Sequence, residues 1–170
     1  MIIGVINIKG GVGKTTSSLA IATAAQRSGL SVTVVDTDPQ GSATLWAQAA
    51  EDADDPLPFP VVSRNQAEIR RMRERRPDRN GELIVIDTPP NGSVVDEAIK
   101  TADFVVIPTL SSPIDLQQTM LTAAQCQDAG KDYAVLIVMA RKGTNALRAF
   151  RTAVEEYGAG IFDTEIPLRE

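Results

Sequence analysis

The chain has 170 residues, of which 43% are hydrophobic and 4% aromatic, and its formal net charge is −5. This length suits one domain with an aliphatic core, and the acidic balance argues against general attraction to nucleic acid or anionic lipid. The sequence has no histidine and one cysteine, Cys126, which excludes histidine-based triads, histidine-ligated metal sites and an intrachain disulfide.

Short runs rich in Val and Ile alternate with helix-compatible runs along most of the chain. This alternation is typical of strands joined by helices, and continuously apolar strands form parallel sheets covered on both faces. The sequence therefore predicts a single α/β domain over residues 1–170, with a mostly parallel, twisted sheet and helices on both of its faces. In chain order, the predicted elements are a strand at 1–6, a helix at 17–27, a strand at 30–36, a helix at 42–50, an edge strand at 59–63, a helix at 65–76, a strand at 82–87, a helix at 91–101, a strand at 103–108, a helix at 114–129, a strand at 133–138, a helix at 145–157 and a strand at 161–166.

A glycine-rich loop separates the first predicted strand from the first predicted helix. Glycines let backbone N–H groups turn toward an anion, and the following helix adds its positive N-terminal end. Lys14 is the candidate ligand of the β- and γ-phosphates, and the Thr15 hydroxyl is the candidate ligand of Mg²⁺. The strand–loop–helix order therefore predicts a nucleotide-phosphate site rather than a simple tight turn. The loop reads Lys9-Gly10-Gly11-Val12-Gly13-Lys14-Thr15-Thr16.

Two other predicted strands end in aspartates that would lie at the same sheet edge as this loop. Asp87 closes one of them, at a position suited to a second Mg²⁺ contact, usually through a water. Asp36 and Asp38 end the other, within Asp36-Thr37-Asp38-Pro39-Gln40-Gly41. Because no histidine is available, we interpret Asp38 as the group that orients an attacking water and Asp36 as a support of the Mg²⁺ shell. A helix-capping aspartate and an Asp-Pro turn are the structural alternatives.

Three motifs in this order resemble those of the ParA/MinD group of ATPases, and the resemblance covers nearly the whole chain. They are the loop at residues 9–16, the run at 36–41 and Asp87-Thr88-Pro89-Pro90. General phosphate loops have glycine at the position of Ile8, and the additional lysine, Lys9, marks the ParA/MinD variant. The resemblance implies a P-loop NTPase fold, with ATP and Mg²⁺ as cofactors. It also implies a dimer in which Lys9 of each subunit reaches the partner's nucleotide.

Within that group, the chain is most similar to the short ParA-type partition ATPases. The loop begins within ten residues of the start, which leaves no room for the N-terminal helix-turn-helix domain of the larger type. The resemblance implies ATP-dependent dimerisation, DNA binding without sequence preference, and slow hydrolysis stimulated by a ParB-like partner. The implied process is plasmid or chromosome segregation. A MinD-like or other cargo-positioning ATPase and a metabolic ATP-dependent synthetase of the same fold are the alternatives.

Adenine recognition is assigned to two residues that follow late strands. Arg141 comes after the strand at 133–138, where its planar guanidinium could stack on a base. Pro167 comes after the strand at 161–166 and resembles the family's proline beside the purine. A solvated Arg-Lys turn is the alternative for Arg141.

A cluster of arginines surrounds the helix predicted at 65–76. Seven arginines face only three carboxylates between residues 64 and 79, which would let one helix meet DNA phosphates without reading bases. A solvated helix face with Glu–Arg pairs is the alternative. The candidates for DNA contact are Arg70, Arg71 and Arg73.

The sequence contains no signal segment and no run of 18 apolar residues. We therefore expect a soluble, cytoplasmic protein without a membrane contact, associated with the nucleoid in its ATP state if the partition interpretation is correct. Similar proteins usually continue with one more helix after the last predicted strand. Its absence leaves two readings open, a compact variant or a truncated sequence.

Overall fold

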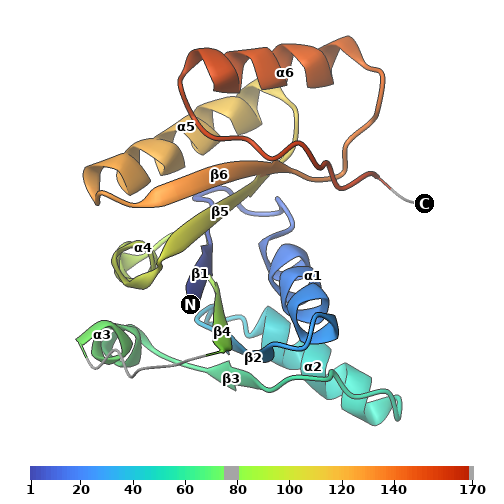
Figure 1. The fold of residues 1–170 in the computed structure, drawn as a ribbon, viewed down its shortest axis with the longest axis vertical. Coiled ribbons are helices and arrows are strands. Elements are labelled where there is room, and N and C mark those ends of the chain that lie inside the picture. The colour runs from blue at the N-terminus through green and yellow to red at the C-terminus, as the bar shows by residue number, and fades with distance from the viewer. Residues whose placement is uncertain (75–80, 169–170) are drawn as a thin grey trace.

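The computed structural model describes residues 1–74 and 81–168. Its strands form one sheet in the order β3-β2-β4-β1-β5-β6, and every neighbouring pair is parallel (Figure 1). The predicted α/β fold with a parallel sheet is therefore confirmed. The strands are β1 (Ile2–Val5), β2 (Ser31–Asp36), β3 (Val61–Ser63), β4 (Glu82–Asp87), β5 (Phe104–Thr109) and β6 (Asp132–Ile137). The helices are α1 (Lys14–Arg27), α2 (Ser42–Asp52), α3 (Gln66–Glu74), α4 (Ser93–Thr101), α5 (Pro113–Asp128) and α6 (Asn145–Glu156).

Helices cover both faces of the sheet, as the continuously apolar strands predicted. One core cluster joins α1 and α2 to β2 and β4 through residues such as Leu19 and Ala43. A second joins α3, α4 and α5 to the opposite face, with Ile69 and Ile99 fully or almost fully buried. In a third, α6 packs beside α5 against β6 (Figure 1). Along β2 and β4, successive side chains enter opposite clusters, as Val85 and Ile86 do, and this alternation fixes the register of these strands.

The prediction of a strand at residues 161–166 is wrong. Only isolated bridges form there, between Val135 and Ile161 and between Ala140 and Pro167. Phe162 N donates to Val135 O at 3.0 Å, but the next β6 carbonyl, at Ile137, is reached by Ile166 N at 2.9 Å. In a regular parallel strand, the residue two positions after Phe162 would donate this second hydrogen bond. Three residues, 163–165, lie between these two bonds, so the segment follows β6 without pairing regularly.

Several helix boundaries have simple physical causes. α1 begins at Lys14, earlier than predicted, because Gly13 adopts the left-handed conformation that starts it (φ 72°). Asn65 caps α3 as predicted, since its side chain accepts from Glu68 N at 3.1 Å and Glu68 accepts from Asn65 N at 2.9 Å. The predicted end of this helix at residue 76 lies outside the described residues. None of the helices described is long and apolar enough to span a bilayer.

Candidate functional site

The glycine-rich loop connects β1 to α1, and hydrogen bonds of buried polar groups hold it in place. Asn7, which is 1% exposed, donates to Pro108 O at 2.9 Å and accepts from Lys9 N at 2.9 Å. Ile8 N donates to the Thr122 hydroxyl of α5 at 3.2 Å. These bonds tie the loop to β5 and α5. Asn7 was not identified from the sequence, although a polar residue directly after an apolar strand could have indicated a buried side chain that anchors the loop.

The start of α1 has the features of an anion site. Gly11 (φ 76°) and Gly13 (φ 72°) have left-handed backbones, and the N-cap residue, Gly13, makes no side-chain hydrogen bond to the helix N-terminus. Lys14 is only 8% exposed, yet its ammonium makes one hydrogen bond within the described residues, to Lys9 O at 2.8 Å. Free helix N–H groups beside a buried cation with unused donors fit a phosphate chain.

Burial changes the pKa of the Lys14 ammonium. Desolvation lowers its pKa, and the carboxylates of Asp87 and Asp38 act in the opposite direction. Both aspartates therefore lie near enough to Lys14 to influence its charge. An anionic ligand would stabilise the same ammonium and add to the effect of these carboxylates.

Asp87 lies at the centre of this edge, and the parallel register sets it beside Val5 on β1 and Asp36 on β2. Its two carboxylate oxygens accept hydrogen bonds from the Thr15 hydroxyl at 2.7 Å and the Ser18 hydroxyl at 2.9 Å. The structure thus brings together two of the residues predicted for the Mg²⁺ site, Thr15 and Asp87. Ser18, one helical turn after Lys14, was not identified from the sequence.

Burial raises the pKa of Asp87 to about 6. The hydrogen bonds from Thr15 and Ser18 oppose this shift, the Asp36 carboxylate adds to it, and the Lys14 ammonium opposes it. The protein holds a carboxylate here that is costly to ionise without a cation. A divalent metal ion would reverse that balance.

This pKa predicts how stability depends on pH in the protein without Mg²⁺ or nucleotide. Between 3.8, the ordinary value, and about 6 the folded state holds more protons than the unfolded state, so the free energy of unfolding falls as pH rises through this window. We expect Asp87→Asn, which cannot ionise, to be more stable than wild type by up to about 3 kcal/mol at about pH 7.5, and the difference to vanish near about pH 4.

Urea unfolding at several pH values measures this difference. Glu51→Gln, which removes an exposed carboxylate from α2, is the matched control and should show no such trend. A difference between Asp87→Asn and wild type that stays constant with pH would contradict the prediction.

Asp36 and Asp38 occupy different environments. Asp36 is 1% exposed and accepts from Asp38 N at 3.1 Å, from Thr44 N at 2.9 Å and from the Thr44 hydroxyl at 2.8 Å. It therefore organises the turn and the first turn of α2, and its support of the Mg²⁺ shell stays a prediction. Asp38 is half-buried, and one of its oxygens accepts from Gln40 N at 2.9 Å. Thr44 was not identified from the sequence.

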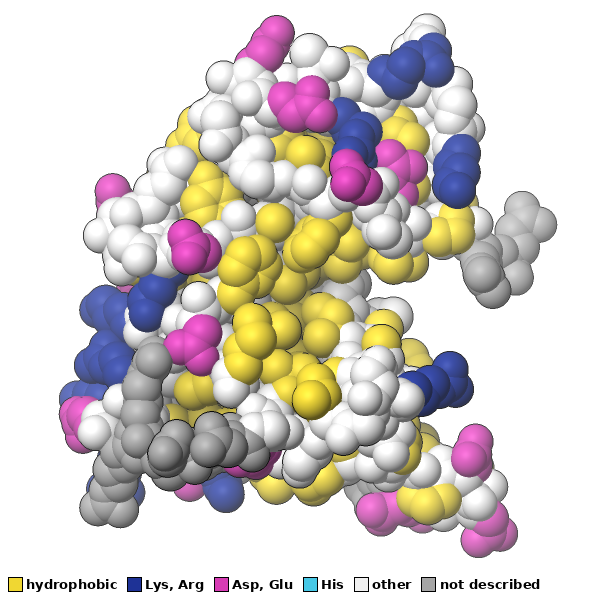
Figure 2. Space-filling view, in the orientation of Figure 1, with side chains coloured by type: hydrophobic (Ala, Val, Ile, Leu, Met, Phe, Trp, Pro, Cys, Tyr) yellow, Lys and Arg dark blue, Asp and Glu magenta, His cyan; other side chains and the backbone are white. Residues whose placement is uncertain are grey.

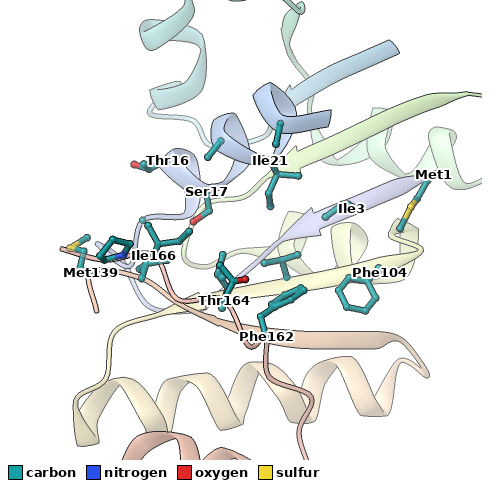
Figure 3. Close-up of a pocket in the computed structure, with 17 residues that line it drawn as sticks. Met1, Ile3, Thr16, Ser17, Ile21, Phe104, Met139, Phe162, Thr164 and Ile166 are labelled. Atoms are coloured by element: carbon teal, nitrogen blue, oxygen red, sulfur yellow. The ribbon is translucent and has the colours of Figure 1, made fainter. Parts of the chain in front are cut away.

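An apolar groove of about 750 Å³ runs from the phosphate loop along the sheet face beside α1 (Figure 3). Pro167 lines its loop end together with Gly13, Thr16 and Met139. Further along, Phe104 of β5 and Phe162 of the C-terminal segment meet edge to face, with ring centroids 6.4 Å apart. The surface is hollowed here between α1 and the C-terminal segment (Figure 2). Arg141 is exposed and does not line the groove.

Three of the four arginines of the cluster that the structure describes lie near carboxylates. Arg64 and Arg70 lie 3.6 Å and 3.9 Å from the glutamates one helical turn later, and Arg73 lies 3.6 Å from Glu97 of α4. Arg71 is exposed and makes no ion pair with any described residue. Lys and Arg side chains do gather on the α3 side of the molecule (Figure 2). The remaining arginines of the cluster, Arg75, Arg76 and Arg79, lie outside the described residues.

Comparison with known proteins identifies the family. The model of the CobQ/CobB/MinD/ParA nucleotide binding domain matches residues 3–170. The chain belongs to this family. The predicted resemblance to ParA and MinD is confirmed, and the loop, the α1 N-terminus and Asp87 are parts of a nucleotide-binding domain.

Individual relatives and solved structures resemble the chain over most of its length. The chain is 34% identical to a "Maintenance of carboxysome distribution protein A" of Gloeobacter kilaueensis, over 97% of this chain and 76% of the relative. It is 30% identical to the protein of the same name from Halothiobacillus neapolitanus, over 98% of this chain and 79% of the relative. Among solved structures, cobyrinic acid a,c-diamide synthase from Mycobacterium smegmatis, with bound ADP and magnesium, has a TM-score of 0.79 at 20% identity, covering 99% of this chain and 86% of that one.

Proposed function

We propose that this member of the family is an ATPase that dimerises when it binds MgATP and uses slow hydrolysis to position a cargo. The observation that carries the proposal is the buried Lys14 ammonium, which makes one hydrogen bond within the described residues. It lies at a helix N-terminus whose N-cap residue provides no side-chain cap, beside the hydrogen-bonded pair of Thr15 and Asp87. These groups match the charge and ligand needs of a triphosphate with Mg²⁺.

In the proposed mechanism, the loop N–H groups and Lys14 bind the phosphates. Thr15 and Asp87 would hold Mg²⁺, which would neutralise charge on the phosphate oxygens when bound. No group of three or more acidic or thiol side chains forms a metal cage in the described part of the chain, so phosphate and water would complete the ligand shell. Asp38 accepts a hydrogen bond from the attacking water and orients it. Pro167 packs beside the base at the loop end of the groove, and Arg141, which lies outside the groove lining, is the second proposed contact of the base.

The relatives' names guide the choice of cargo. Two relatives at 30% identity or above are named for carboxysome distribution, which supports a cargo-positioning ATPase. A plasmid or chromosome moved with a ParB-like partner is the partition form of the same proposal. The synthase shares the fold at 20% identity, and a synthetase would not need Lys9 to cross to a second subunit.

Sedimentation velocity and a gel shift on arbitrary duplex DNA test the proposal, each with ATP, ADP or no nucleotide and with Mg²⁺ present. We expect a dimer and a DNA complex with ATP alone. A chain that stays monomeric with ATP would contradict the proposed function. A dimer that does not bind DNA would indicate that the protein positions its cargo on a surface other than the nucleoid.

Arg70 and Arg71 are the proposed DNA contacts on α3. Charge reversal of both residues to Glu should weaken DNA binding in the ATP state about tenfold or more and reduce the slope of log affinity against log salt by about 2, because two phosphate contacts are lost. Arg27→Glu, an exposed charge reversal at the end of α1, is the control. Fluorescence anisotropy at several salt concentrations measures both quantities. Because Arg27→Glu changes the net charge by half as much as the double reversal, a loss in log affinity of about half the size in the control would assign the effect to net charge.

A further inference from the structure

Lys9, the residue that distinguishes this loop from general phosphate loops, is held within its own subunit. Its ammonium lies 2.6 Å from Asp115 Oδ1 on α5. The lysine side chain is 31% exposed and the aspartate side chain 5% exposed. Sequence reasoning did not identify Asp115, which lies 106 positions away in the chain.

Asp115 is fixed in place by the N-terminus of α5. Its backbone N donates to the N-cap Ser112 hydroxyl at 3.2 Å, and the same hydroxyl contacts Oδ2. The positive helix end also favours a carboxylate at this position. Since Ile8 N is bonded to Thr122 of the same helix at 3.2 Å, α5 and the phosphate loop are held at a fixed spacing.

The other carboxylate oxygen depends on Lys9. Oδ1 is buried, and among the described residues the Lys9 ammonium, 2.6 Å away, is the group that compensates its charge. Withdrawal of Lys9 would leave a buried carboxylate oxygen without a partner, which is unfavourable. Conversely, an ammonium neutralised at 2.6 Å contributes little charge to a second acceptor until it moves away.

We propose that Asp115 is a latch that holds Lys9 in its own subunit and thereby opposes ATP-driven dimerisation. This inference rests on the proposed function, in which Lys9 of one subunit reaches the partner's nucleotide. The latch sets the ATP concentration at which the chain dimerises, because part of the free energy of forming the trans contact is used to break the Lys9–Asp115 pair.

Asp115→Asn tests the latch, because the amide keeps the side-chain shape and a bond to Ser112 but removes the charge. At fixed protein and Mg²⁺ concentrations, we expect the ATP concentration for half-maximal dimerisation, measured by sedimentation velocity, to fall by about fivefold or more. An unchanged or higher midpoint would overturn the proposal, and a higher one would show that Asp115 positions Lys9 for the trans contact.

A second background shows whether the effect acts through Lys9. In Lys9→Gln, the further change Asp115→Asn should leave any residual dimerisation unaltered, and a persistent shift would overturn the latch. Ser112→Ala, which removes the hydroxyl that orients Oδ2, is a second variant in case Asp115→Asn does not fold, and should shift the midpoint in the same direction. If wild type does not dimerise at any ATP concentration, the proposed function fails and the latch falls with it. If wild type dimerises and neither variant shifts the midpoint, only the latch fails.

Discussion

Lys14→Ala is expected to abolish ATP-dependent dimerisation. The Lys14 ammonium is buried, makes one hydrogen bond within the described residues, to Lys9 O at 2.8 Å, and lies at the N-terminus of α1. Truncating a buried, charged partner of a ligand costs about 2–5 kcal/mol, which corresponds to roughly 30- to several-thousand-fold in affinity. Isothermal titration with ATP and Mg²⁺ measures the binding loss, and sedimentation velocity measures the dimer.

The same substitution should not unfold the protein. Burial penalises the Lys14 ammonium in the absence of an anion, as its lowered pKa shows, so its removal takes away an unfavourable charge as well as one hydrogen bond. We expect the thermal midpoint of the nucleotide-free variant to stay within a few degrees of wild type. Lys142→Ala, at an exposed position, is the matched control. Normal dimerisation of Lys14→Ala with ATP would exclude this loop as the phosphate site.

Much of the site was predictable because its determinants are local in sequence. The glycines, Lys14 and Thr15 form one continuous motif, and Asp87 was placed correctly because parallel strands end at the same sheet edge. The pairing of Thr15 with Asp87 follows from these two facts together. The same reasoning gave the layers of the fold, since strands that are apolar on both faces must be covered by helices.

Other features depend on contacts between distant segments and left no local pattern. Their positions in the sequence do not distinguish the environments of Asp36 and Asp38. Only the hydrogen bonds from Thr44 reveal that the Asp36 carboxylate is already bound within the protein. The Lys9–Asp115 pair joins segments 106 positions apart. The last predicted strand failed for a related reason: Ile161, Phe162 and Ile166 have strand-like character, but Arg151 binds Phe162 O at 3.1 Å and Glu165 at 3.2 Å, which holds the intervening residues out of register.

Asp38→Ala is expected to trap the ATP-bound dimer. Asp38 is half-buried, lies near enough to Lys14 to affect its pKa, and has one carboxylate oxygen engaged with Gln40 N at 2.9 Å. Its other oxygen makes no hydrogen bond to any described residue, which leaves it available to a water. Removing a group that orients or deprotonates the nucleophile typically costs about 10²-fold or more in rate. Phosphate release should therefore fall by that amount while ATP-dependent dimerisation persists.

Two further variants separate this chemical role from the structural one, because Asp38 also closes a turn in which Gly41 N donates to Asp38 O at 2.8 Å. Asp38→Asn keeps an acceptor for Gln40 N and should preserve the turn, yet we expect it to hydrolyse ATP as slowly as Asp38→Ala. Gln40→Ala changes an exposed side chain of the same turn without removing that backbone donor and should turn over normally. If Asp38→Asn retains wild-type turnover, the carboxylate contributes only to the turn. If both Asp38 variants lose dimerisation together with hydrolysis, Asp38 supports nucleotide binding rather than the attack of water.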